Sequence, residues 1–101
     1  MSYRLSEQAG RDLLAIYASS VSTFGVHQAD RYSDGLLDTF DLLARVPHAA
    51  RLRSEVDPPI RAYPFKAHII IYDVTDAADV VIVRIRYGRE DWISDPRGDG
   101  D

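Results

Sequence analysis

Three extended, apolar runs in the second half of the chain constrain the fold more than any other feature. The runs are IRAYPF at 60–65, AHIIIYDV at 67–74 and DVVIVRIRY at 79–87. One residue separates the first two runs and four residues separate the second two, so both connections are short enough only for antiparallel hairpins. Pro64 cannot donate a hydrogen bond to a neighbouring strand, which places the first run at a sheet edge. The sequence therefore predicts an antiparallel meander.

Two amphipathic helices are predicted before the meander. Ser6, which follows the short extended segment 3–5, is a favourable N-cap for the first helix. Gly25 ends that helix, and Pro47 ends the second. Apolar residues recur at three- and four-residue steps in both helices, and a connection this short predicts an antiparallel helical hairpin. The faces predicted to be buried are Ala9, Leu13, Ile16, Tyr17, Val21 and Phe24 in the first helix and Ala29, Tyr32, Ser33, Leu36, Leu37, Phe40, Leu43 and Ala44 in the second.

The element order β-α-α-β-β-β predicts an α+β fold, with the helical hairpin packed on a small, mostly antiparallel sheet. A chain of 101 residues has room for one hydrophobic core, and we expect a single domain over residues 1–93. Residues 47–59 lack a regular period and are predicted to form a long loop. Residues 94–101 are polar and acidic and are predicted to form a flexible tail.

Composition excludes several classes of protein. The chain has no cysteine, which rules out disulfides and thiolate zinc sites. His27, His48 and His68 are widely separated, so we expect neither a metal site nor a cofactor. No apolar run approaches the roughly 18 residues that span a bilayer, and no hydrophobic leader follows the N-terminus. These features predict a cytoplasmic protein without membrane contact.

Charge is divided unevenly along the chain. Residues 1–44 carry three basic and six acidic residues, residues 45–89 carry eight basic and five acidic residues, and residues 90–101 carry one basic and five acidic residues. The total of −4 argues against general affinity for nucleic acid, because a protein that follows a phosphate backbone usually carries a broad basic stripe. The basic central block is suited instead to an acidic protein partner.

The end of the last predicted strand carries much of this positive charge. Strand alternation places Val80, Ile82, Arg84 and Arg86 on one face and Val81, Val83, Ile85 and Tyr87 on the other. Arg89 and Trp92 follow Gly88, and Arg61 lies near the start of the meander. Arginine beside an exposed aromatic residue is typical of interface hot spots, so we expect a binding surface here. The alternative is that Arg84 and Arg86 pair with surface acids such as Asp73 or Asp79, while Trp92 folds back onto the sheet.

Several segments together resemble the ParE branch of the RelE/ParE toxins of bacterial type II toxin–antitoxin modules. They are YRLSEQAGRDLLAIY from Tyr3, FGVHQADRY from Phe24 and VRIRYGRED from Val83, with Pro47, Ile60-Arg61, His68 and Ile71-Tyr72 between them. Each segment is weak evidence alone, but their order and spacing extend over some ninety positions. They agree with the fold predicted from periodicity.

The resemblance implies a cytoplasmic toxin without enzymatic activity, and therefore without catalytic residues, that poisons DNA gyrase. It also implies a hetero-oligomer with a ParD-like antitoxin, through which alone the toxin reaches operator DNA. An antitoxin with an acidic, amphipathic segment matches the cationic surface. We expect Arg61, Arg84 and Arg86 to bind the antitoxin, and Tyr87, Arg89 and Trp92 to bind the target.

Two alternatives remain open from the sequence. RelE-like relatives are ribosome-dependent mRNA endonucleases, and Arg61, Arg84, Arg89 and Tyr87 have the chemistry to hold RNA and stabilise a phosphorane. The chain is also compatible with a non-toxic, degenerate toxin that serves only as antitoxin partner and corepressor. Tyr87 motivates this reading, because ParE-like sequences usually carry histidine at that position.

Overall fold

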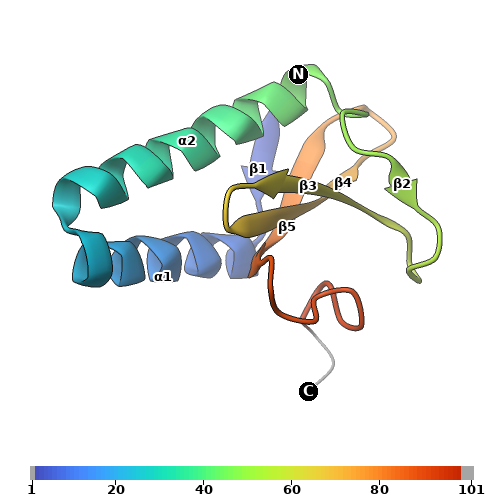
Figure 1. Ribbon diagram of the computed structural model, residues 1–101. Coiled ribbons are helices and arrows are strands. Elements are labelled where there is room, and N and C mark those ends of the chain that lie inside the picture. The colour runs from blue at the N-terminus through green and yellow to red at the C-terminus, as the bar shows by residue number, and fades with distance from the viewer. Residues whose placement is uncertain (1, 99–101) are drawn as a thin grey trace.

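The computed structural model describes residues 2–98 as a helical hairpin packed on one five-stranded sheet (Figure 1). The sheet order is β1-β5-β4-β3-β2. The α+β class and the predicted element order are confirmed, and a two-residue strand within the predicted loop 47–59 is an addition. The elements are β1 (Tyr3–Leu5), α1 (Glu7–Phe24), α2 (Val26–Arg45), β2 (Leu52–Arg53), β3 (Ile60–Phe65), β4 (His68–Val74) and β5 (Val80–Tyr87).

The meander pairs as the short connections predict. Strand β4 is antiparallel to both β3 and β5, and β1 lies parallel to β5 at the outer edge. Strand β3 is not the edge strand, because Arg61 and Ile60 pair with β2. Pro64 nevertheless lies beyond the residues paired with β2, so its missing N–H costs the sheet no hydrogen bond there.

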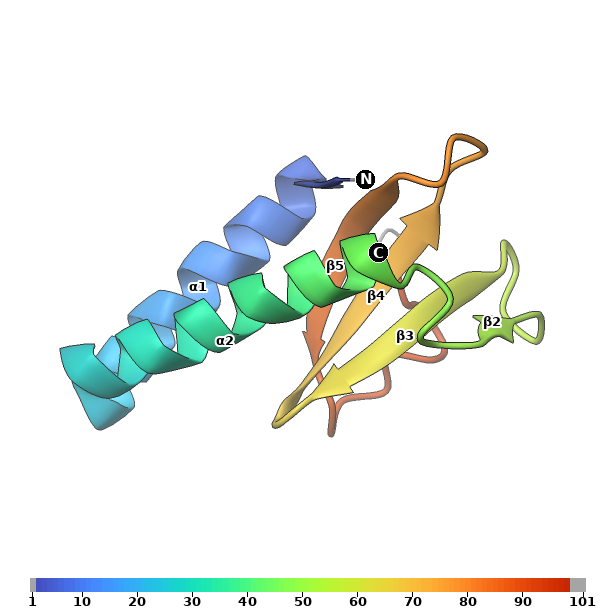
Figure 2. The same ribbon diagram turned by 90° about the horizontal axis from the view of Figure 1, so that it is seen from above.

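Local capping sets both ends of α1. The Ser6 hydroxyl oxygen accepts a hydrogen bond from the Ala9 N–H at 3.0 Å, and the hydroxyl donates to the Val83 carbonyl at 2.7 Å. The N-cap therefore also fastens α1 to β5. Gly25 has a φ of +90°, a conformation that glycine adopts without steric cost, and it separates α1 from α2. Seen from above, the two helices run antiparallel and extend past the end of the sheet (Figure 2).

The predicted helical faces are wrong at two positions, and the overhang explains one of them. Leu36, Phe40 and Leu43 are fully buried against the sheet, with Ile70, Tyr72 and Ile82 below them. Phe24, however, is 63% exposed and Leu37 is 36% exposed. Phe24 lies at the tip of the hairpin, where no strand reaches. A sequence period identifies an apolar face but does not reveal what covers it.

A β-bulge in β5 changes which residues face the helices. Tyr72 pairs with Ile82 and Ile71 pairs with Arg84, which leaves Val83 without a partner on β4. The extra residue shifts the alternation, so Ile85 joins Ile82 in the core beneath the helices. The prediction that Val81, Val83, Ile85 and Tyr87 share one face is therefore wrong beyond the bulge.

The last described residues cover the opposite face of the sheet. We call residues 88–98 the strap; they have no regular secondary structure. Trp92 of the strap is buried in a second apolar cluster with Val56, Ile60, Ala62 and Ile71. The predicted flexible tail begins at residue 94, yet Asp95, Pro96 and Arg97 accept hydrogen bonds from arginines of β5. Residues 99–101 of the predicted tail lie outside the described residues. No helix within residues 2–98 is long and apolar enough to cross a membrane.

Candidate interaction surface at the end of the sheet

A groove of about 570 Å³ lies between the helical hairpin and the end of β4 and β5. It exists because the inner faces of α1 and α2 continue past the sheet. The side chains that form it are mostly apolar or aromatic, and none carries a full charge at neutral pH. They are Ala15, Ile16, Ser19, Ser20, Phe24, Gln28, Tyr32, Ala67, His68 and Tyr87. A groove of this kind suits the apolar face of a helix or extended segment.

Aromatic residues form one end of the groove. The Tyr32 hydroxyl and His68 Nδ1 are hydrogen-bonded at 2.7 Å, and the His68 and Tyr87 rings meet edge to face with centroids 6.0 Å apart. Burial lowers the pKa of His68, although the nearby Glu90 carboxylate opposes this shift. Burial also raises the pKa of Tyr32. Both side chains are therefore uncharged at neutral pH, which keeps this end of the groove apolar.

Two cations line the same hollow as the exposed ring of Tyr87. Lys66 and Arg89 line a second hollow of about 440 Å³, together with Ala67, Ile69, Tyr87 and Gly88. The Lys66 ammonium lies 5.8 Å from the Tyr32 ring centroid and 5.5 Å from that of Phe65. Tyr87 is 47% exposed and lines both the groove and the hollow. The hollow and the groove therefore form one continuous surface, apolar at the helices and cationic at the hairpin tip.

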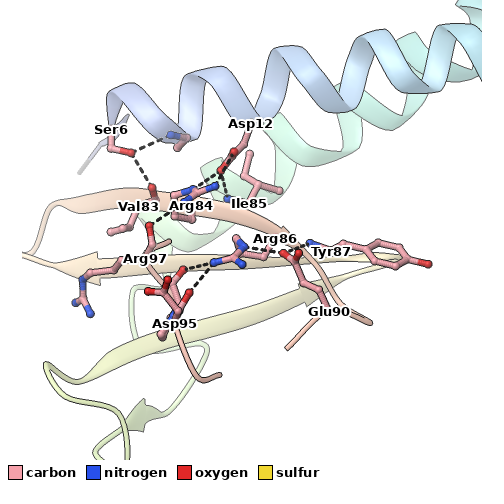
Figure 3. Close-up of polar contacts among 12 residues, drawn as sticks. Ser6, Asp12, Val83, Arg84, Ile85, Arg86, Tyr87, Glu90, Asp95 and Arg97 are labelled. Atoms are coloured by element: carbon pink, nitrogen blue, oxygen red, sulfur yellow. Dashed lines mark hydrogen bonds and ion pairs between the residues drawn. The ribbon is translucent and has the colours of Figure 1, made fainter. Parts of the chain in front are cut away.

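Arg84 does not extend toward this surface. Its Nε and Nη2 donate to the Asp12 carboxylate at 2.7 and 3.1 Å, and Nη1 donates to the Arg97 carbonyl at 2.8 Å (Figure 3). Asp12 also accepts the Ile85 N–H at 3.0 Å, beyond the point where β1 ends. Arg84 thus joins α1, β5 and the strap. Its expected availability to a partner is wrong for this conformation, because an acid of the first helix is already bound.

Arg86 is held in a similar way. Its Nε donates to Glu90 at 2.6 Å and its Nη1 donates to the Asp95 carbonyl at 2.7 Å (Figure 3). The Arg86 side chain is only 15% exposed. The alternative reading, that both arginines pair within the chain, describes this conformation, but with Asp12 and Glu90 in place of Asp73 and Asp79.

Trp92 and Arg61 also lie away from the surface formed by the groove and the hollow. Trp92 is 7% exposed, with the Arg53 guanidinium 5.2 Å from its ring centroid, so the expected exposed aromatic is a core residue. Arg61 lies on β3, two strands from β5, and donates to the Ala50 carbonyl at 2.7 Å. It therefore anchors the loop before β2 and does not join Arg84 and Arg86.

Of the predicted site residues, Tyr87 and Arg89 remain together and exposed at the end of β5. The residues that sequence reasoning missed are those of the groove, above all Ile16, Tyr32 and His68. No local signal separates them from core residues, because a half-buried groove residue and a buried one follow the same helical period.

Comparisons with known proteins agree with this architecture. The family model described as ParE toxin of type II toxin-antitoxin system, parDE, matches residues 3–92. Toxin ParE1 from two strains of Mycobacterium tuberculosis, CDC 1551 / Oshkosh and H37Rv, is 30% identical over 89 residues, which cover 88% of this chain and 91% of the relative. A chain of the chromosomal ParDE TA system from P. aeruginosa superposes with a TM-score of 0.74 at 22% identity, covering 86% of this chain and 95% of that one.

The helical hairpin on a five-stranded sheet is the fold that this chain shares with the chain from P. aeruginosa. The family model and the relatives define the class, a toxin of a type II toxin–antitoxin system. Within that class, the chain belongs to the ParE toxin family.

Proposed function

We propose that this ParE-type toxin acts in the cytoplasm by poisoning DNA gyrase, without enzymatic activity of its own, and that a ParD-like antitoxin neutralises it in a hetero-oligomer. The observation that carries the proposal is the surface at the end of β5. Tyr87 and Arg89 are exposed beside Lys66, whereas Arg84 and Arg86 are held inside the chain. An exposed aromatic ring that lines the same hollow as two cations is suited to binding another macromolecule.

The groove supports an antitoxin partner. Its walls are mostly apolar or aromatic from Phe24 at the hairpin tip to Tyr87 at the sheet end, and Lys66 and Arg89 lie just beyond. An amphipathic segment fits such a groove through its apolar face, and acidic residues at its end meet the two cations. Operator DNA is then contacted by the antitoxin and only indirectly by this chain.

Tyr87 and Arg89 are proposed to contact the target. Trp92 contributes indirectly, since its burial holds the strap that begins directly after Tyr87. A single surface that serves both target and antitoxin explains neutralisation simply, because an antitoxin seated in the groove covers Tyr87.

A ribosome-dependent mRNA endonuclease is the second candidate. One observation favours it: His68, Tyr87, Lys66 and Arg89 lie at the same end of the sheet and have the side-chain chemistry of phosphodiester cleavage. Arg61 and Arg84, however, do not join them. The Tyr32 hydroxyl already occupies His68 Nδ1, and the chain carries a net charge of −4, which disfavours docking to ribosomal RNA.

Expression of the chain alone in bacteria separates these functions. Gyrase poisoning predicts filamentous cells and a DNA-damage response, which Tyr87→Ala with Arg89→Ala abolishes and Arg45→Ala, on the exposed end of α2, preserves. Rapid translation arrest with cut messages establishes the endonuclease. Normal growth with a soluble, folded chain establishes the non-toxic antitoxin partner.

A further inference from the structure

The strap is attached to the rest of the chain mainly through side chains. It adds no strand, and its internal turns are local, from Glu90 N–H to Tyr87 and from Asp95 N–H to Trp92. Its attachments include the buried Trp92 ring, the groups bound by Arg84 and Arg86, the Arg97 side chain, which donates to the Pro58 carbonyl and pairs with Asp73, and one backbone bond from Gly88 to Ala67. A segment held mainly by side chains, without a ladder of backbone hydrogen bonds, opens at a lower free energy than the paired strands beneath it.

The face beneath the strap has the composition of a docking site. Ile60, Ala62 and Ile71 form its centre and, with the strap in place, are at most 6% exposed. Ile69 and Val83 pack at its margin. Around it lie the guanidinium groups of Arg53, Arg84 and Arg86, of which Arg53 lies 3.8 Å from Glu55 and Arg84 is paired with Asp12. With the strap removed, Arg86 loses its partner Glu90, and the face is apolar at the centre with an unpaired cation at the rim, which matches an acidic segment with an apolar anchor.

The strap itself is an acidic segment with an apolar anchor. It carries Glu90, Asp91 and Asp95 around the single large anchor Trp92. Its polar contacts do not use the full capacity of Arg86, which binds one carboxylate and two neutral carbonyls, those of Asp95 and Pro96. Carboxylates bind guanidinium groups more strongly than neutral carbonyls do, so a competing segment with better placed acids has a free-energy advantage at these positions.

We propose that the strap is an exchangeable cover, and that an acidic polypeptide segment with an apolar anchor replaces it on the face formed by Ile60, Ala62 and Ile71. The strap holds the face in the free chain because its effective concentration is high. Exchange releases Trp92 and turns Arg86 toward the incoming acids, while Arg84 stays paired with Asp12 and offers only its Nη1. This second docking face lies on the opposite side of the sheet from the groove, and the inference does not rest on the proposed function.

Hydrogen exchange of the wild-type chain tests the first half of the proposal. The amides of Glu90, Trp92 and Asp95 are expected to exchange through a local opening, at least tenfold faster than the central amides of β4 and with little dependence on low urea concentrations. Acrylamide is expected to quench Trp92, the only tryptophan, through the same opening. Strap amides that exchange only through global unfolding would overturn the proposal.

A peptide in solution tests the second half. Trp92→Ala removes the anchor and makes the chain tryptophan-free, so a peptide with the sequence REDWISDPRG, residues 89–98, supplies the only indole emission. We expect that emission to shift to the blue on titration with the Trp92→Ala chain. Adding Arg86→Gln to the Trp92→Ala chain is expected to weaken peptide binding about tenfold, because the loss of one hydrogen bond to a charged group lowers affinity by about that factor. Adding Arg45→Gln instead is expected to leave the affinity unchanged.

A scrambled peptide of the same composition controls for nonspecific association. Equal binding of the scrambled peptide, no emission shift, or no effect of Arg86→Gln would each contradict the proposal. If circular dichroism shows that Trp92→Ala is unfolded, Trp92→Leu fills more of the cavity and is used in the same titration.

Discussion

Asp12 is expected to contribute more to stability than any other acidic residue of α1. Its carboxylate accepts three hydrogen bonds, two from Arg84 at 2.7 and 3.1 Å and one from the Ile85 N–H at 3.0 Å. The two side chains are 17% and 18% exposed, so water replaces these bonds only in part. Asp12→Ala removes the acceptor of Arg84 Nε and Nη2 and of the Ile85 amide at a poorly hydrated sheet edge.

The expected loss follows from these contacts. Removal of one partner of a fully buried ion pair costs about 3–5 kcal/mol, and the partial exposure here places Asp12→Ala near the lower end, at about 3 kcal/mol. Asp12→Asn keeps one acceptor and loses the charge, so about half that cost is expected. With an m-value of about 1.5 kcal/mol per molar urea for a domain of this size, Asp12→Ala lowers the unfolding midpoint by about 2 M.

Urea unfolding followed by circular dichroism measures this midpoint. Arg11→Ala is the matched control, because Arg11 is adjacent and pairs with Glu7 through side chains that are 69% and 83% exposed. Such a pair contributes less than about 0.5 kcal/mol. If Asp12→Ala lowers the midpoint no more than Arg11→Ala, the structural role assigned to the Asp12–Arg84 pair is refuted.

Three further predictions concern a turn, a titration and the groove. Ala78 has a φ of +66°, so Ala78→Gly is expected to stabilise the chain by about 0.5–1 kcal/mol and raise the melting temperature; an unchanged or lower value contradicts this. Burial lowers the pKa of His68 below its ordinary value of 6.5 in the folded chain, so the unfolded chain binds more protons and stability falls as the pH drops below about 6.5. His68→Gln should reduce the difference in unfolding free energy between about pH 7.5 and 5.5, and an identical difference refutes the assignment. Phe24→Ser is expected to change stability by less than about 0.5 kcal/mol, because Phe24 is 63% exposed, but to weaken antitoxin binding in calorimetry; equal affinity removes Phe24 from the interface.

The helices and the meander were predictable because their signals are local. Ser6 and Gly25 act within a few residues of the helix ends that they determine, and the hairpins follow from the lengths of their connections. In contrast, the pairing of β1 with β5 joins residues almost eighty positions apart, and no feature of the three-residue segment 3–5 predicts it.

The positions of Arg84 and Arg86 were not predictable from the sequence, because they also depend on contacts between residues far apart in the chain. The bulge at Val83 lies where Ser6 binds the Val83 carbonyl and Asp12 binds the Ile85 amide, at sequence separations of 77 and 73 residues. The alternation of β5 therefore depends on groups of α1 and its N-cap, which strand periodicity does not include. Trp92 is a similar case, because a polar surrounding sequence predicts exposure, yet the apolar face beneath it is left open by the helices.

Two features of the candidate site could be predicted from the sequence: its location at the end of the last strand, and the pair Tyr87 and Arg89. What could not be predicted is the groove, because it arises from an overhang of the helices relative to the strands. Lys66 is the single residue between the first two extended runs, and its sequence context does not place it at a site. Its ammonium lies over two rings, an arrangement that depends on α2 approaching the tip of the β3–β4 hairpin.

A gyrase cleavage assay with purified components tests the central claim most directly. The chain is mixed with gyrase, ATP and supercoiled plasmid, and trapped cleavage complexes are released with detergent and protease. We expect linear plasmid to accumulate with the wild-type chain and with Arg45→Ala, and to disappear when Tyr87→Ala and Arg89→Ala are combined in a folded chain. Absence of linear plasmid with the wild-type chain, together with cleavage of messages on translating ribosomes, would contradict the account.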